Sequence, residues 1–186
     1  MSIGLLALAL VLIGLFVASL YNELVRLRNG ADNAFGSIDV QLKQRCDLIP
    51  KVVDAVRGYM GHEQSLLAQL TELRARATAA DAAPSERMAL DGQMASLLHG
   101  LAARVEAYPE LQASATVLML QRSLNEVEAQ IAAARRTYNA AVTAYNTAVE
   151  TVPANLVAGA FGFARRPLFE ASAEDRAVPQ TVSLAR

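Results

Sequence analysis

The sequence predicts an all-α protein in which one N-terminal transmembrane helix continues into a long antiparallel bundle of the four-helix type. A run of 18 residues near the start carries no charge, and the rest of the chain is dominated by Ala and Leu, without Trp. Apolar residues recur at steps of three and four along two long segments, which is the spacing of a buried helix face. We expect an anchor in residues 1–21, a bundle in residues 22–153, and a short helix with a mostly irregular tail in residues 154–186.

The uncharged run covers residues 3–20, IGLLALALVLIGLFVASL. As a helix it would be roughly 27 Å long, close to the thickness of the hydrocarbon core of a bilayer. A cleaved signal peptide is the alternative, but it would have a basic start and a shorter apolar stretch. This chain has no Lys or Arg before Arg26. The run is therefore predicted to be a retained anchor whose partner is the lipid bilayer.

Two features of the anchor predict its orientation and its packing. Arg26 and Arg28 follow the apolar run, and basic flanks favour the cytoplasmic side, although Glu23 dilutes this flank. We therefore expect the N-terminus outside and the bundle in the cytoplasm. Gly14 and Ala18 are small residues four positions apart, which lets transmembrane helices approach closely. This spacing predicts a homo-oligomer.

The first bundle helix is predicted to be one rod with the anchor, because no Pro or clear cap separates them. The apolar positions after the run step by threes and fours through the Asn29-Gly30 pair, and they are Leu24, Leu27, Ala31, Ala34 and Ile38. Pro50 is poorly tolerated inside a helix. The rod is expected either to kink there or to restart with Asp47 as N-cap.

A polar layer is expected inside the bundle, because the same register places Gln41 and Arg45 on the apolar seam. A buried Arg without a partner costs several kcal/mol. The candidate partners are two carboxylates and two Tyr hydroxyls, from Asp39, Asp47, Tyr138 and Tyr145. Such a layer would fix which helices pair and in which register. The alternative is that Arg45 reaches from the edge of the seam to water.

The middle of the chain predicts two further helical segments. Residues 52–77 form a second helix or the far half of the first, with Gly58 and Gly61 as weak points. Their apolar face consists of Val52, Val56, Leu66, Leu67, Leu70 and Leu73. Residues 75–84 are the clearest linker. A third helix begins near Ser85, which can cap it, and ends around Pro109, with a buried face of Met88, Leu90, Met94, Leu97, Leu98 and Leu101.

The most regular pattern begins near Leu111 and predicts a second long helix that Pro153 stops. Its seam is expected to hold no charge and consists of Leu120, Leu124, Val127, Ile131, Ala134, Tyr138, Ala141, Tyr145, Ala148 and Val152. The segments YNAAVTA and YNTAVET are near copies one heptad apart, which places Tyr138 and Tyr145 on one face with Asn139 and Asn146 beside them.

The tail begins with an apolar piece, and GAFGFARRPLF combines three Phe residues with Arg165 and Arg166. Aromatic and basic residues together are typical of an interfacial membrane anchor. The other interpretation is that Phe161, Phe163 and Phe169 cap the end of the bundle.

No motif in the sequence predicts catalysis, a cofactor or a metal site. His62-Glu63 lacks the second His of HExxH, His99 stands alone, and there is no P-loop, GxGxxG or GxSxG. A net charge of −1 without a dense basic patch argues against nucleic acid as a partner. The single Cys46 is interpreted as a small apolar helix residue. We therefore expect no enzyme.

Several motifs, in this order behind one anchor, resemble the LemA family of bacterial membrane proteins: YNELVRLRNGADNAF, SIDVQLKQRCDLIPKVV, RGYMGHE, EAYPELQAS, EVEAQIAAARRTYNAAVTAYNTAVETVPANLVA and GFARRPLFE. The resemblance covers essentially the whole chain, although Phe35 and Gly36 stand where the family often has Trp-Ser. It implies a long antiparallel helical bundle anchored in a bacterial membrane. Members of the family are linked to membrane organisation, including formation of the magnetosome membrane, so the resemblance implies a role of that kind. It implies no catalytic residues.

Three functions are weighed. A membrane-anchored scaffold that self-associates explains the anchor, the seams and the lack of catalytic motifs. A membrane-tethered module that recruits or regulates a partner membrane protein, such as a protease, is the alternative, and it predicts an exposed patch on the bundle. An enzyme is the third and has the least support.

Overall fold

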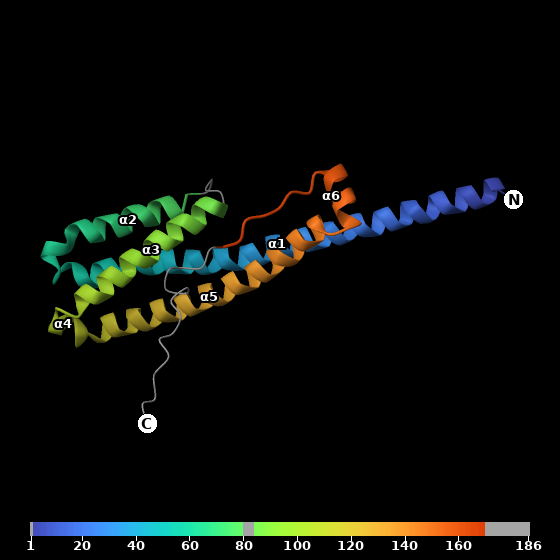
Figure 1. The fold of residues 1–186 in the computed structure, drawn as a ribbon. Coiled ribbons are helices and arrows are strands. Elements are labelled where there is room, and N and C mark those ends of the chain that lie inside the picture. The colour runs from blue at the N-terminus through green and yellow to red at the C-terminus, as the bar shows by residue number, and fades with distance from the viewer. Residues whose placement is uncertain (1, 80–83, 170–186) are drawn as a thin grey trace, which may run out of the picture.

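The computed structural model describes residues 2–79 and 84–169, and the regular structure in these ranges is entirely helical (Figure 1). The elements in chain order are α1 (Ser2–Arg57), a 3-10 turn η1 (Gly61–Glu63), α2 (Gln64–Ala77), α3 (Pro84–Val105), α4 (Pro109–Gln112), α5 (Ala115–Glu150) and α6 (Ala154–Phe161). The predicted all-α class is confirmed. The centre of the expected linker and the side chain of Ser85 lie outside the described residues.

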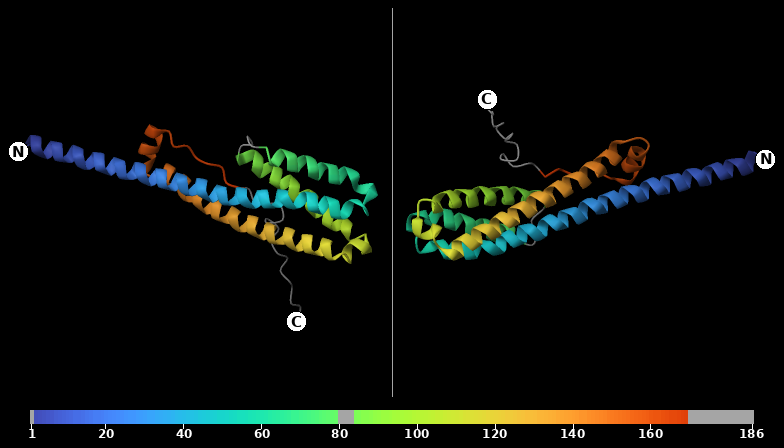
Figure 2. Two further views of the ribbon diagram at one scale, coloured as in Figure 1. Left: turned by 180° about the vertical axis from the view of Figure 1, so that it is seen from behind. Right: turned by 90° about the horizontal axis from the view of Figure 1, so that it is seen from below.

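Helix α1 is 56 residues long and joins the apolar run to the bundle without a break. It is continuous through Asn29 and Gly30, and its N-terminal part projects beyond the other helices (Figures 1 and 2). An apolar window of 18 residues in it is long enough to cross a membrane, and none of that window is buried. Ile3 is 83% exposed and Phe16 is 54% exposed. The predicted single rod is therefore confirmed, with a transmembrane candidate at its start.

Helices α1 and α5 form a long antiparallel pair that runs through the whole bundle (Figure 2). Helices α2 and α3 pack beside the half that is remote from the N-terminus, so four helices surround one core there, which includes Val53, Leu70, Leu90 and Leu111. Towards the N-terminus, α6 and the segment after it take the place of α2 and α3. The core in that half includes Ile38 with Tyr138, and Leu24 with Tyr145.

Pro50 lies inside α1, so the expected restart of the helix with Asp47 as its N-cap is wrong. Proline has no N–H, and the Cys46 carbonyl one turn earlier therefore loses its helical donor. Arg74 of α2 replaces it, because its Nε donates to the Cys46 oxygen at 3.0 Å. A side chain from the neighbouring helix thus satisfies the carbonyl that proline leaves open. The helix ends at Arg57, immediately before Gly58.

The predicted apolar face of residues 52–77 is confirmed, since all six of its side chains are buried. The seam of α5 differs from the prediction. Arg135 and Val142 are buried, whereas Ala134 and Ala141 are only partly covered. The expectation of an uncharged seam is therefore wrong. Helix α5 ends at Glu150, and Val152, which was expected on the seam, is 72% exposed.

Candidate functional site

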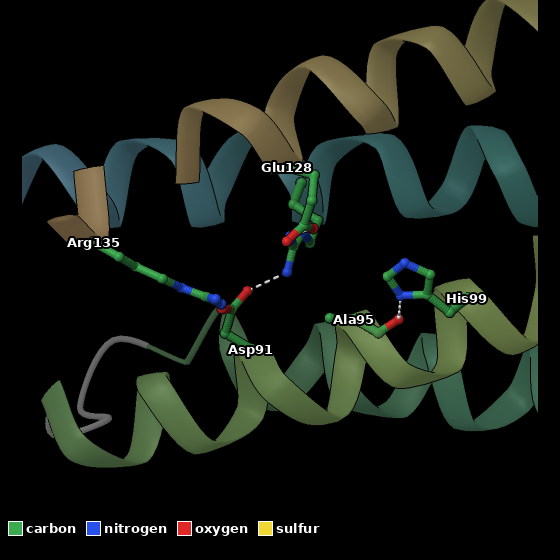
Figure 3. A network of polar contacts seen from close by, with 6 residues as sticks. Asp91, Ala95, His99, Glu128 and Arg135 are labelled. Atoms are coloured by element: carbon green, nitrogen blue, oxygen red, sulfur yellow. Dashed lines mark hydrogen bonds and ion pairs between the residues drawn. The ribbon is translucent and has the colours of Figure 1, made fainter. Parts of the chain in front are cut away.

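A layer of buried charges ties three helices together in the middle of the bundle. Arg45 of α1 forms ion pairs with Asp91 of α3 and with Glu128 of α5. Asp91 also pairs with Arg135 of α5, and Figure 3 shows the Asp91 carboxylate pointing at the end of the Arg135 side chain. The side chains of Arg45 and Asp91 are 1% and 2% exposed. Two cations thus meet two anions, which is what buried charges require.

The burial of this layer makes each member depend on the others. Burial lowers the pKa of the Arg45 guanidinium, and the charges of Arg135 and Asp91 act on it in opposite directions. Glu128 is partly exposed, so the layer reaches water on the α5 side. Removing Arg45 from this layer leaves the buried Asp91 with one opposite charge fewer, and losing a partner in a buried ion pair is strongly destabilising. The layer therefore favours the one register of α1, α3 and α5 in which all four groups meet.

The expected partners of Arg45 were wrong. Asp39 pairs with Arg87 of α3, and Asp47 is exposed. Gln41 is partly buried, and among the described residues its Oε1 has no hydrogen-bond partner. Tyr138 and Tyr145 donate to the tail instead.

The true partners lie on helical stripes that the sequence does contain. Asp91 falls three positions after Met88 and three before Met94, and Arg135 falls four after Ile131 and three before Tyr138. This spacing places both on buried faces. A search for charges at seam positions on all the helices would therefore have found them.

The repeated Tyr-Asn pairs of α5 bind the backbone of the tail. Tyr145 Oη donates to the Ala164 oxygen at 3.0 Å, and Tyr138 Oη donates to the Pro167 oxygen at 3.1 Å. Each neighbouring Asn makes two bonds with one tail residue. Asn146 Nδ2 donates to the Arg166 oxygen and its Oδ1 accepts from the Arg166 N–H, both at 2.9 Å.

The second Asn repeats this arrangement one heptad earlier in α5. Asn139 Nδ2 donates to the Phe169 oxygen at 2.9 Å, and its Oδ1 accepts from the Phe169 N–H at 2.7 Å. A heptad advances about 10.5 Å along a helix, and three extended residues span about 10 Å. The step from Asn146 to Asn139 therefore matches the step from Arg166 to Phe169. Burial raises the pKa of the Tyr138 hydroxyl, which keeps it protonated as a donor.

The aromatic residues of the tail have different surroundings. Phe163 and Phe169 are buried, whereas Phe161 is 58% exposed. Phe169 packs beside Ile38 and Tyr138, away from the ends of the bundle, so the interpretation that all three Phe residues cap its end is wrong. The Arg135 guanidinium lies over the Phe169 ring, 4.6 Å from its centroid. Arg135 therefore links the tail to the charged layer. Residues 170–186 lie outside the described part of the chain.

Gly14 and Ala18, the predicted packing face of the anchor, are exposed in the single chain. A Cβ added at Gly14 would meet no atom within 4 Å. This face is therefore open to a neighbour of any kind.

A cavity of about 240 Å³ lies beside the charged layer, and its lining includes Cys46, Asp91 and Arg87. Burial raises the pKa of the Cys46 thiol, so the protonated form, a poor nucleophile, is favoured there. Neither His62 nor His99 lines the cavity. In the described ranges, no group of three or more His, Cys, Asp or Glu residues could hold a metal ion.

Comparison with known proteins decides the family. The sequence model of the LemA family matches residues 34–183, which is most of the chain. The chain belongs to the LemA family. Protein LemA of Metamycoplasma hominis is 29% identical to it over 163 residues, which are 88% of this chain and 74% of the relative. The predicted family is therefore confirmed.

Two further relatives of this LemA-family chain are named as magnetosome proteins. Magnetosome protein MamQ 2 of Paramagnetospirillum magneticum is 39% identical over 80 residues, which are 43% of this chain and 29% of the relative. Magnetosome protein MamQ of Magnetospirillum gryphiswaldense is 24% identical over 174 residues, with 80% of this chain and 64% of the relative covered. The chain thus spans less than two thirds of either MamQ protein.

Proposed function

We propose that this LemA-family protein is a membrane-anchored, non-enzymatic scaffold that self-associates and helps to organise or shape the bacterial membrane. The observation that carries the proposal is the continuity of α1. One helix supplies both the uncovered apolar segment and a spine of the bundle. Because no loop separates the two parts, contacts between anchors would also fix how neighbouring bundles are arranged.

The interior of the bundle supports a structural role. Arg45 and Arg135 are both paired with Asp91 of their own chain, so the charges of the layer already have partners, and only the Arg135 Nε lacks a hydrogen-bond partner among the described residues of the layer. The Cys46 thiol is buried beside them. General acid, base or nucleophilic catalysis needs such groups to be free to reach a substrate. In this layer they serve the packing of the helices.

The surface of the anchor supports self-association. Gly14 and Ala18 lie four residues apart on an uncovered part of α1, and small residues at this spacing allow close approach of two helices in a membrane. The membrane-organising role that the family resemblance implies is consistent with relatives named as magnetosome proteins. We place the bundle on the cytoplasmic side of the inner membrane, because Arg26 and Arg28 follow the apolar run.

A membrane-tethered binding module is the second candidate, and one observation favours it. Tyr59 and Met119 are 55% and 59% exposed. Tyr59 follows the end of α1 and Met119 lies in the first two turns of α5, and both of these helix ends are remote from the N-terminus (Figure 1). Exposed apolar side chains at that end could receive a partner membrane protein, such as a protease.

The substitution Gly14→Ile tests the scaffold in a lipid bilayer. Full-length protein carrying Cys46→Ala and Gln93→Cys is labelled with donor or acceptor dye and reconstituted as a mixture into vesicles. We expect energy transfer between chains, and we expect Gly14→Ile to reduce it, because the added side chain holds neighbouring helices apart. The control Ala9→Ile adds bulk to another face of the same helix. Equal energy transfer in Gly14→Ile and Ala9→Ile would show that the chains do not meet through Gly14. No energy transfer in the parent would contradict the scaffold and favour the binding module.

A further inference from the structure

The short helix α6 lies against the last turns of the apolar run. Val157 and Ala158 of α6 are buried in a cluster to which Val17 and Leu20 of α1 contribute. The Phe161 ring packs edge-on against Tyr21, with centroids 4.9 Å apart. Figure 1 shows α6 running across α1 rather than along it. The first charged residue after the run, Glu23, comes within one turn of Leu20. Helix α6 is thus held where the apolar part of α1 ends.

Large apolar side chains are exposed on α6 and just before it. Val152, two residues before the helix, is 72% exposed, and Leu156 within the helix is 71% exposed. Phe161 at the end of the helix is 58% exposed, although one edge of its ring contacts Tyr21. Residues 151–164, TVPANLVAGAFGFA, contain no charged residue. Charges begin at the borders of this segment, where Arg165 Nη1 lies 2.9 Å from Glu150 Oε1. An uncharged, apolar helix face with charged borders is the pattern expected of a membrane interface contact.

The turn that ends α6 keeps this apolar segment compact. Gly162 has a φ of 72°, a left-handed conformation that a residue without a Cβ adopts at no cost. The Phe163 N–H donates back to the Ala158 oxygen at 2.9 Å. Phe163 therefore turns inward, and the Arg28 guanidinium lies over its ring, 5.3 Å from the centroid. Phe161 stays partly exposed and contacts Tyr21, the residue that follows the apolar run.

We propose that α6 lies in the interfacial region of the bilayer that α1 crosses, with Leu156 and Phe161 inserted among the lipid chains near the headgroups. This inference rests on the membrane anchor of the proposed function. The partner is lipid, because α6 is packed against α1 at the level where the apolar surface of α1 ends. Helices of this kind bury their apolar face by roughly 5 to 10 Å. Aromatic rings such as those of Phe161 and Tyr21 also suit this depth.

The contact gives α6 a specific task. A single transmembrane helix can rotate about its own axis, and its tilt is set by packing and by interfacial anchors. Helix α6 contacts one side of α1. Its insertion into the interfacial region would therefore fix both the tilt of α1 and its rotation about its own axis. The tail after α6 is bound to Asn146 and Asn139 of α5. The membrane contact would therefore orient the whole bundle.

The absence of Trp from the chain makes a direct test simple. Leu156→Trp in the full chain introduces one fluorophore on the outer face of α6. The protein is reconstituted into vesicles of phosphatidylcholine and phosphatidylglycerol that carry a quencher on the acyl chain, either near the headgroup or near the bilayer centre. Phe161→Trp is a second probe of α6. Leu12→Trp reports the middle of the anchor, and Met119→Trp reports the remote end of the bundle.

The proposal expects the shallow quencher to reduce the emission of Leu156→Trp and Phe161→Trp more than the deep quencher does. It expects Leu12→Trp to respond most to the deep quencher and Met119→Trp to neither. Quenching of Leu12→Trp without quenching of both α6 probes would overturn the α6 contact while leaving the anchor intact. A blue-shifted but unquenched α6 probe would assign this face to a second copy of the protein. If neither quencher reduced the emission of Leu12→Trp, the membrane anchor itself would be wrong, and the inference about α6 with it.

Discussion

Asn146 and Arg166 are joined by two hydrogen bonds that run in opposite directions, so that one side-chain amide pairs with both backbone groups of a tail residue. Asn139 pairs with Phe169 in the same way. The tail therefore runs along α5, and its backbone groups are paired with side-chain amides of the helix. An amide is the one common side-chain group that supplies a donor and an acceptor in this geometry.

Replacing Asn146 by Ala should release the tail. Both bonds to Arg166 are lost, and we expect the free energy of unfolding to fall by about 1 to 3 kcal/mol, the usual cost of unpaired buried groups. Trypsin should then cleave faster between Arg165 and Arg166. The control Asn125→Ala removes an exposed amide from the same helix and should leave both quantities unchanged. An unchanged cleavage rate in Asn146→Ala would show that these bonds do not hold the tail.

The heptad copies in α5 predicted the neighbourhood of Tyr138, Tyr145 and their Asn residues, but not the segment that they bind. Periodicity reports which face of a helix is buried. It does not report what covers that face, because an extended tail without a repeat leaves no pattern of its own. GFARRPLF contains no regular alternation of apolar and polar residues that would predict an extended segment bound to a helix. The partner of the Tyr-Asn pairs could be found only from the folded chain.

The charged layer shows the same limit in another form. The register of α1 correctly placed Arg45 among buried residues, since the side chain is 1% exposed. The expected partners lie near Arg45 in sequence or are Tyr residues of α5, whereas the structure pairs Arg45 with Asp91 of α3 and Glu128 of α5. In the chain, α2 lies between α1 and α3. The apolar pattern of one helix does not predict which other helices pack against it, and so it does not predict which helix supplies the partner of a buried charge. The fold class, in contrast, could be predicted from length, composition and spacing alone.

Arg45→Ala should destabilise the bundle strongly. It leaves the Asp91 carboxylate buried with Arg135 as its remaining ion-pair partner among the described residues. Breaking a buried pair in this way costs roughly 3 to 5 kcal/mol. Thermal melts of the detergent-solubilised protein would measure the effect, with the exposed Arg122→Ala of α5 as control. Loss of such a pair should lower the melting temperature by more than about 2 °C. A variant that melts within about 2 °C of the parent would mean that the layer contributes little to the stability of the bundle.

A compensated variant separates the two roles of the layer. Arg45→Met combined with Asp91→Leu and Arg135→Met removes the three buried charges together and leaves Glu128, which is partly exposed to water. Apolar replacements of this kind are often neutral or stabilising. We expect this triple variant to melt near the parent and well above Arg45→Ala. If the layer also fixes helix register, the triple variant should form mixed assemblies where the parent forms one. A triple variant as unstable as Arg45→Ala would contradict the ion-pair explanation.

The orientation of the anchor can be read in intact cells with a thiol reagent that does not cross membranes. The buried Cys46 is first replaced by Ala, and a single Cys is then introduced at Ser2 or at the exposed Gln93. Because Arg26 and Arg28 favour the cytoplasmic side, Ser2→Cys should react in intact cells and Gln93→Cys only after permeabilisation. Labelling in the opposite sense would place the bundle outside the cytoplasm.

If α1 joins copies of the protein within one membrane, as we propose, the mass of the extracted particle shows it most directly. One chain has a mass of 19.9 kDa. Light scattering of the full-length protein in a mild detergent, with the detergent contribution subtracted, should give a defined multiple of that mass. Helix packing through Gly14 and Ala18 predicts that the multiple persists on dilution until the detergent separates the helices. A protein mass of a single chain at every concentration would contradict the scaffold.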